Sequence, residues 1–249
     1  MGDVRTPAVS IRYLSYRREE YVRETLPRLA MSVGCQFPIE FIIHDNNGDR
    51  RLDGFYRDVE EAQKRSLSNV VSFGIWYYKN RGYAAATNIF WRGTYAPLIC
   101  SIDNDIEVKT EDWVSKLVWA IHADERVAVV GGFTDSWDET AARKSLDQLP
   151  LILGQGSVGV RSREYIDGNY IARRSVIDKY GELDESDGFF QGWTSYQSRL
   201  TRAGLIVGYS DPPVLMAHLE SPYHPKHREY PEYTEWKNQV RGTRHESVS

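Results

Sequence analysis

The chain has 249 residues, of which 41% are hydrophobic and 27% charged, as in an ordinary globular protein with a sizeable core. Its formal net charge of -4 argues against a general attraction to nucleic acid or to an anionic membrane surface. Because no apolar run approaches the roughly 20 residues of a membrane span, and no signal-peptide core follows Met1, a membrane-spanning or secreted protein is not expected.

The first half of the chain alternates apolar runs with amphipathic segments. Residues 39–44 (IEFIIH) form a nearly continuous apolar run, which is typical of a buried parallel strand. Pro27 indicates a break or kink in the first predicted helix. We predict strands at 9–14, 39–44, 70–77, 97–102 and 127–130, and helices at 19–32, 53–66, 82–91 and 111–123. This order predicts an α/β domain with a mostly parallel sheet and right-handed crossovers.

The regular alternation ends near Gly131. Residues 133–164 are mixed in character and contain three spaced glycines. Beyond them we predict helices at 174–180 and 194–203, strands at 206–209 and 214–218, and a polar, proline-containing arm with a short helix at 234–240. These patterns therefore indicate that the second half is a variable extension of the α/β domain formed by the first half.

The most informative motif is Ser101-Ile102-Asp103-Asn104-Asp105, which directly follows the apolar strand PLIC. Ligands of α/β proteins bind at the carboxyl ends of strands, where these two carboxylates are expected. Carboxylate oxygens suit Mg²⁺ or Mn²⁺, and such an ion can bridge to a diphosphate. The alternative is a solvated turn after a strand, because an Asp-x-Asp pair is common.

Two further segments are predicted at the same edge. Asp45 ends the second strand, where its carboxylate can accept a hydrogen bond from a base N–H or begin an Asx-turn, and both can hold together. The segment 79–88 (KNRGYAAATN) opens a helix with small residues, so a ligand can approach, and Arg81 is placed to meet a base or a phosphate. Its alternative is a capped surface helix.

Five segments in this order resemble the family 2-like glycosyltransferases with the GT-A fold: VSIRYLSYRREEYVRETLPRL, EFIIHDNNGD, KNRGYAAATN, LICSIDNDIEV and DGNYIARRSVIDKYGELDESDGFF. The resemblance implies a nucleotide-diphospho-sugar donor, a divalent metal (Mn²⁺ or Mg²⁺) and a single domain. Residues 1–132 would bind the nucleotide sugar, 133–218 the acceptor, and 219–249 would form a C-terminal arm. It implies Asp105 as a metal ligand and the following nucleotide-sugar site: Tyr16, Arg17, Asp45, Asn47, Arg81, Gly82, Asn88, Asp103 and Asn104.

The chain departs from this family after Phe189-Phe190. Inverting members usually place Glu-Asp there, with the Asp as general base, whereas this chain reads QGWTS. Asp184, Glu185 and Asp187 lie just upstream, and we predict Asp187 as the base because Gly188 allows the chain to turn after it. An already ionised acceptor, a retaining mechanism and solvated loop carboxylates are the alternatives.

His218 follows the strand VLMA, and many GT-A enzymes complete the metal site with a late histidine. We predict it as a second ligand, with a structural role as the alternative. Trp137, Tyr170 and Trp193 lie in the variable half and are predicted to contact the sugar or acceptor, although most aromatic rings belong to cores.

Three functions fit these patterns: transfer of a sugar from a UDP- or dTDP-sugar, nucleotidyl transfer, or a degenerate binding module. A nucleotidyltransferase usually has a glycine-rich basic loop after the first strand, and YLSYRREEY has no glycine. The two cysteines, Cys35 and Cys100, are expected to be buried free thiols in a reducing compartment, which predicts a cytoplasmic protein. No nucleic-acid partner is expected, and the acceptor and oligomeric state stay open.

Overall fold

The structure is a computed structural model that describes residues 5–134, 138–154, 158–186 and 191–220, together with residues 230, 231 and 235. The elements of the first half are β1 (Val9–Ser15), α1 (Glu19–Ser32), β2 (Ile39–Asp45), α2 (Asp53–Ser66), β3 (Val70–Tyr77), α3 (Tyr83–Gly93), β4 (Leu98–Asp103), β5 (Ile106–Val108), α4 (Trp113–Ile121) and β6 (Val127–Gly131). The alternation predicted for this half is confirmed, and the short strand β5 is an addition.

The second half contains the predicted helices near 174–180 and 194–203 and the predicted strands near 206–209 and 214–218, and it adds one helix and three short strands that the sequence patterns did not predict. Its elements are α5 (Glu139–Leu146), β7 (Leu151–Leu153), β8 (Gly159–Ser162), β9 (Tyr170–Arg173), α6 (Arg174–Tyr180), α7 (Gln191–Arg202), β10 (Ile206–Asp211) and β11 (Met216–His218). Strands of three or four residues are too short to show a hydrophobic period, which is why β7, β8 and β9 escaped prediction. The helix expected at 234–240 lies outside the described residues.

The described strands form a nine-stranded sheet in the order β3-β2-β1-β4-β9-β6-β10-β8-β7, and a separate pair, β11-β5. Strands β1 to β4 run parallel, and β9 enters antiparallel between β4 and β6. Since β6 and β10 are parallel to each other and oppose β9, six of these strands share one direction. The mostly parallel α/β sheet is thereby confirmed.

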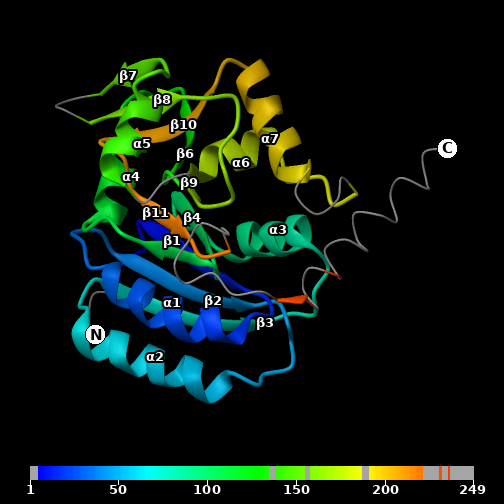
Figure 1. Ribbon diagram of the computed structural model, residues 1–249. Coiled ribbons are helices and arrows are strands. Elements are labelled where there is room, and N and C mark those ends of the chain that lie inside the picture. Colours follow the sequence, from blue (N-terminus) through cyan, green and yellow to red (C-terminus); the bar gives the residue numbers. More distant parts are fainter. Residues whose placement is uncertain are drawn as a thin grey trace.

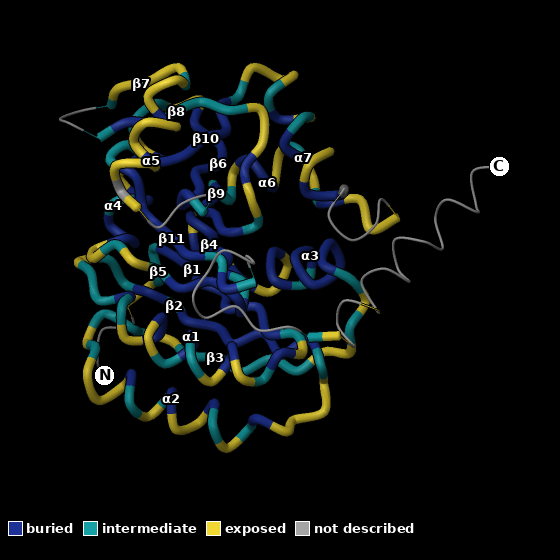
Figure 2. The backbone as a smooth tube through the Cα atoms, viewed as in Figure 1, coloured by how far each residue is buried: buried dark blue, intermediate teal, exposed yellow. Residues whose placement is uncertain are grey.

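Helices cover both faces of this sheet (Figure 1). Buried side chains of α1, α2 and α4 pack on one face, together with odd-numbered β1 residues such as Ile11 and Tyr13. Helices α3, α5, α6 and α7 pack on the other face, where Leu14 and Ile42 point. Figure 2 shows the buried strands between these two helical layers. None of the helices in the described ranges has the length and hydropathy that crossing a bilayer demands.

Two local expectations need correction. Helix α1 continues through Pro27 without a break, because Leu26, Leu29 and Ala30 on either side of it pack into the core and hold the helix in place. Cys100 is a buried free thiol as expected, but Cys35 is only half-buried.

A polar layer lies inside the core beneath the strand ends. Arg12 of β1 is fully buried and donates through Nε and Nη2 to the Ser101 hydroxyl and through Nη2 to the Thr87 hydroxyl. His44 of β2 is fully buried as well, and neither of its ring nitrogens has a hydrogen-bond partner among the described residues. Burial, with a further contribution from the Arg12 charge, lowers the pKa of His44 to about 3.

His44 should therefore make the protein less stable in acid. Its pKa in the unfolded chain is near 6.5, so protonation favours the unfolded state as pH falls from 6.5 towards 3, by about 1.4 kcal/mol per pH unit. We expect the free energy of unfolding of wild type, relative to His44→Phe, to fall by about 2 kcal/mol between pH 6.5 and pH 5. Urea unfolding of both proteins at the two pH values measures this difference, and a constant difference would contradict it.

Candidate active site

The carboxyl ends of three neighbouring parallel strands form the core of the site. Asp45, the last residue of β2, lies opposite Ser15 at the end of β1, and Asp103, the last residue of β4, lies opposite Leu14. The loops that follow these strands therefore meet at one edge of the sheet, which is where open α/β sheets bind ligands. The sequence prediction of a shared edge for Asp45 and Asp103 agrees with this register.

Asp45 is almost fully buried and begins an Asx-turn. Its Oδ1 accepts from the Asn47 backbone N–H at 2.7 Å and from Asn47 Nδ2 at 3.0 Å, and its Oδ2 accepts from the Tyr56 hydroxyl at 3.0 Å. A carboxylate oxygen has two acceptor positions, so Oδ2 has one hydrogen bond and room for a second. The residue can thus shape the turn and still accept one N–H from a ligand.

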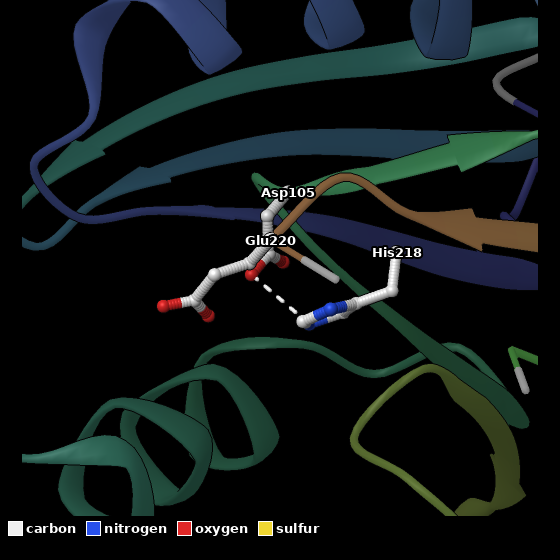
Figure 3. A group of neighbouring side chains, drawn as sticks. All are labelled: Asp105, His218 and Glu220. Carbon is white, nitrogen blue, oxygen red and sulfur yellow. Dashed lines mark ion pairs between the residues drawn. The ribbon is translucent and has the colours of Figure 1, made fainter. Parts of the chain in front are cut away.

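Asp105 lies in the turn between β4 and β5, and strand pairing brings His218 to it. Strand β11 pairs antiparallel with β5 so that His218 lies opposite Ile106, and the Leu219 N–H donates to the Asp105 carbonyl. His218 Nε2 is 3.2 Å from Asp105 Oδ2, and Figure 3 shows the ring facing this carboxylate. Glu220, two residues further on, completes a group whose possible ligand atoms lie within 4.8 Å of one another.

The electrostatics of this group suit a cation. Burial by itself raises the pKa of Asp105. The positive charges of Arg18 and His218 lower this pKa by more than burial raises it, so the net pKa is far below its usual range. Burial lowers the pKa of His218, whereas the Asp105 carboxylate and Glu220 raise it, and the net shift is upward. Asp105 is therefore ionised at neutral pH, and its negative charge acts directly on the His218 ring.

The donor set fits a divalent metal of the Mn²⁺ or Mg²⁺ type. Two carboxylates and one imidazole are ligands that Mn²⁺ accepts, and carboxylates alone suit Mg²⁺. The two predicted ligands, Asp105 and His218, are brought together. Sequence reasoning missed Glu220, although its spacing of two residues from His218 at the end of a strand is a signal for side chains on the same face.

Sequence reasoning also missed Arg18, which lies against the same group. Its Nη1 is 2.7 Å from Asp105 Oδ2 and 3.3 Å from Glu220 Oε2, while Nη2 donates to Asn104 Oδ1 at 2.8 Å. Only 6% of the Arg18 side chain is exposed, so this is a buried ion pair and not a surface contact. Nothing in the sequence distinguishes Arg18 from its neighbour Arg17.

Asp103 lies beside this group, but its carboxylate is not one of the three possible metal ligands. Its backbone N–H donates to Asn169 Oδ1 at 2.9 Å, and its Oδ1 is buried with no hydrogen-bond partner among the described residues. Burial and the nearby Asp105 charge raise its pKa. A Cβ at Gly168 would lie 3.2 Å from Asp103 Oδ2 and 2.8 Å from the Tyr83 hydroxyl, so glycine keeps the backbone close to this carboxylate.

A cavity of about 760 Å³ opens beside the strand ends. Its lining includes Asp45 and Asn47 of the second loop and Arg17, Arg18 and Arg51 around them. Two of these residues are linked, because the Arg17 N–H donates to Asn47 Oδ1 at 2.9 Å. Guanidinium groups bind phosphate oxygens well, so the cavity combines an acceptor for a base with cations for phosphates.

Two predicted nucleotide contacts have internal roles. Asn88 is buried in α3, where it exchanges hydrogen bonds with the Leu183 backbone and donates to Glu185 Oε1. Asn104 accepts from Arg18 and donates to the carbonyl oxygens of Tyr16 and Arg17, which holds the first loop. Both amides are occupied by hydrogen bonds within the protein and organise loops, and their contact with a nucleotide stays a prediction.

The other predicted residues lie around the site at different depths. Gly82 precedes α3 with φ of 97°, a left-handed value that glycine adopts without strain, and donates to Asn80 Oδ1. Arg81 is exposed and lies 3.6 Å from Glu185. The Tyr16 ring lies under the Arg17 guanidinium at 5.4 Å. Asp187 lies outside the described residues, and so does Trp137.

The aromatic pair predicted to contact a sugar is part of the core. Tyr170 is fully buried and Trp193 is 4% exposed, and their rings stack with centroids 4.2 Å apart. Trp193 Nε1 donates to the carbonyl oxygens of Ile166 and Asp167. Both rings are therefore used in core packing, and their contact with a sugar or acceptor stays a prediction.

Comparison with known proteins identifies the family. The sequence profile of glycosyl transferase family 2 matches residues 10–181, well over half of the chain. The chain belongs to glycosyl transferase family 2. The matched region runs from β1 to the end of α6 and so contains Asp45, Asp103 and Asp105 of the family 2 domain. No curated protein sequence matches the chain.

Solved structures show the same GT-A fold at low sequence identity. A mannosyltransferase from Pyrobaculum calidifontis, in complex with GDP-Man and Mn²⁺, has a TM-score of 0.65 at 15% identity and covers 88% of this chain and 59% of its own. TarS of S. aureus has a TM-score of 0.56 at 13% identity, and the match covers 84% of this chain and 59% of the TarS chain. GalNAc-T7, solved with UDP, GalNAc and Mn²⁺, has a TM-score of 0.54 at 13% identity, and the match covers 87% of this chain and 44% of the GalNAc-T7 chain. This family 2 chain therefore spans about six tenths or less of each of these proteins.

Proposed function

We propose that the chain transfers a sugar from a nucleotide-diphospho-sugar, with a UDP- or dTDP-sugar favoured, to an acceptor that contains a nucleophilic group. The observation that carries this proposal is the meeting of Asp45, Asp103 and the group Asp105, His218 and Glu220 at adjoining strand ends beside the cavity. Family membership supports glycosyl transfer, and the Mn²⁺ named with two similar structures supports a divalent metal.

In this proposal each group has a separate task. Asp105, His218 and Glu220 would hold Mn²⁺ or Mg²⁺, which supplies positive charge to the leaving diphosphate. Asp45 accepts the base N–H, and Asp103 lies next to the metal group where a ribose or sugar hydroxyl can donate to its unpartnered Oδ1. We further propose that residues 1–132 bind most of the donor and residues 133–218 the acceptor, with His218 and, from the arm 219–249, Glu220 adding metal ligands from outside the donor half.

A donor-hydrolysis assay tests this function directly. The full chain with Mn²⁺ is incubated with UDP-, dTDP-, GDP- and ADP-sugars, and free nucleoside diphosphate and sugar are measured. We expect slow hydrolysis of one donor class, which EDTA suppresses. Release of pyrophosphate from a nucleoside triphosphate and sugar phosphate would instead identify a nucleotidyltransferase.

A degenerate binding module is the second candidate, and one observation favours it. The first turn of α7 contains no acidic residue, although inverting family members usually place the base near this position. Tight nucleotide binding without hydrolysis or transfer of any donor would support this module.

The base preference gives a sharper prediction. Asp45 Oδ2 has room for one more donor, which matches the single ring N–H of uracil or thymine. We expect calorimetry in Mn²⁺ to show UDP or dTDP binding at least about tenfold more tightly than ADP, equal to about 1.4 kcal/mol. Asp45→Asn should remove this preference, because the amide presents a donor as well as an acceptor. Tighter binding of ADP or GDP would contradict this role of Asp45.

A further inference from the structure

The guanidinium of Arg18 contacts two of the three possible metal ligands, Asp105 and Glu220. A single nitrogen, Nη1, contacts Asp105 Oδ2 at 2.7 Å and Glu220 Oε2 at 3.3 Å. The same Asp105 oxygen is 3.2 Å from His218 Nε2. The three possible metal ligands and Arg18 therefore converge on one small volume, which Figure 3 shows for Asp105, His218 and Glu220.

The first loop is built to deliver this side chain inward. Arg17 and Arg18 both have left-handed backbone conformations, with φ of 51° and 48°, which non-glycine residues seldom adopt in succession. Asn104 braces this turn by donating to the carbonyl oxygens of Tyr16 and Arg17 and by accepting from Arg18 Nη2. The geometry is thus defined by several contacts and does not depend on one exposed ion pair.

A metal and this guanidinium cannot share the site. Asp105 and Glu220 would hold an ion through carboxylate oxygens, and Nη1 of Arg18 already contacts one oxygen of each, Asp105 Oδ2 at 2.7 Å and Glu220 Oε2 at 3.3 Å. A divalent charge and a guanidinium would then be neighbours in a buried place with little screening. Arg18 must leave when the metal enters, and until then it neutralises the two carboxylates that would otherwise repel each other.

We propose that Arg18 is a built-in counter-ion that occupies the metal position in the metal-free protein and is released when metal and donor bind. The proposal rests on the function proposed above. Arg18 also lines the cavity beside Asp45 and Asn47, so its released guanidinium can pair with an oxygen of the donor diphosphate. Metal alone then binds weakly, and metal and nucleoside diphosphate bind cooperatively through Arg18.

The test measures Mn²⁺ binding and not activity. The electron paramagnetic resonance signal of free Mn²⁺ is followed while wild type, Arg18→Gln and Arg23→Gln are titrated without nucleotide. Arg23 is a matched control that loses the same charge from an exposed position on α1, where it pairs with Glu19. We expect Arg18→Gln to bind Mn²⁺ at least about tenfold more tightly than wild type, and Arg23→Gln to match wild type.

A second titration in the presence of UDP tests the release of Arg18. UDP should tighten Mn²⁺ binding by about tenfold or more in wild type and by much less in Arg18→Gln. Arg18→Lys keeps the charge but not the planar fork, so it should show an intermediate Mn²⁺ affinity, and it serves if Arg18→Gln does not fold by circular dichroism.

The outcomes separate this inference from the proposed function. Equal Mn²⁺ affinity of wild type and Arg18→Gln would overturn the role of Arg18 while the metal site stands. No Mn²⁺ binding by either protein, with or without UDP, would overturn both the counter-ion and the metal site. Donor hydrolysis that EDTA does not affect would then point to glycosyl transfer without a metal.

Discussion

Replacing Asp105 by alanine should abolish metal-dependent donor binding and lower kcat/KM by about 10³-fold or more. The reason is that Asp105 is the buried carboxylate of the metal group, with its Oδ2 3.2 Å from Nε2 of His218, a second possible ligand. Without this carboxylate the remaining His218 and Glu220 offer too few ligands, and the several kcal/mol that a metal contributes to transition-state charge are lost. Calorimetry with UDP in Mn²⁺ and single-turnover kinetics measure the two effects.

The matched control for this variant is Asp49→Ala. Asp49 also lines the cavity, but its carboxylate is exposed and pairs with Arg51. We expect its effect on Mn²⁺-dependent binding to be less than about threefold, because an exposed pair contributes little. Asp105→Ala removes one of the two carboxylates that pair with the buried Arg18, which can destabilise the fold. Circular dichroism must therefore show that the variant is folded. Unchanged UDP affinity of folded Asp105→Ala in Mn²⁺ would refute the ligand role of Asp105.

The second large effect concerns the general base, which we propose to be Asp187. Asp187→Asn should lower turnover by about 10²- to 10⁴-fold, the usual contribution of a general base, and leave UDP binding nearly unchanged. Asp187 itself lies outside the described residues, so the proposal rests on its place in the sequence before Gly188-Phe189-Phe190. Thr194 and Ser195 are alcohols, which are too weakly basic to replace it near neutral pH.

The two acids before Asp187 are suitable controls because they have partners of their own. Asp184 accepts from the backbone N–H and hydroxyl of Ser186, and these bonds lower its pKa. Glu185 accepts from Asn88 Nδ2 and lies near Arg81. We expect Asp184→Asn and Glu185→Gln to change turnover by only a few fold. If all three variants keep near-normal turnover, the acceptor is already ionised or the mechanism retains configuration, and NMR of the product anomer distinguishes these two.

Local patterns in the amino-acid sequence were enough to predict the first half of the fold, apart from β5, and the edge of the sheet at which the site lies. Five strands of five to eight residues alternate with amphipathic helices there, and each of the five is long enough for its pattern to be unambiguous, whereas the three-residue strand β5 was not predicted. The carboxyl ends of parallel strands meet at one edge for any such sheet, so Asp45, Asp103 and Asp105 could be grouped before any coordinates were known. The motif order was sufficient to indicate the family.

Apart from His218, the side chains that join Asp105, and those that are occupied elsewhere, became evident from the three-dimensional packing. His218 and Glu220 reach Asp105 through the pairing of β11 with β5, and β5 has only three residues, too few for a readable period. Arg18 turns inward because of a left-handed backbone pair, whereas sequence alone makes it equivalent to Arg17. Asn88, Tyr170 and Trp193 looked available for ligands but are used by the core. The physical reason is that these roles arise from contacts between residues far apart in the chain, and local patterns do not encode such contacts.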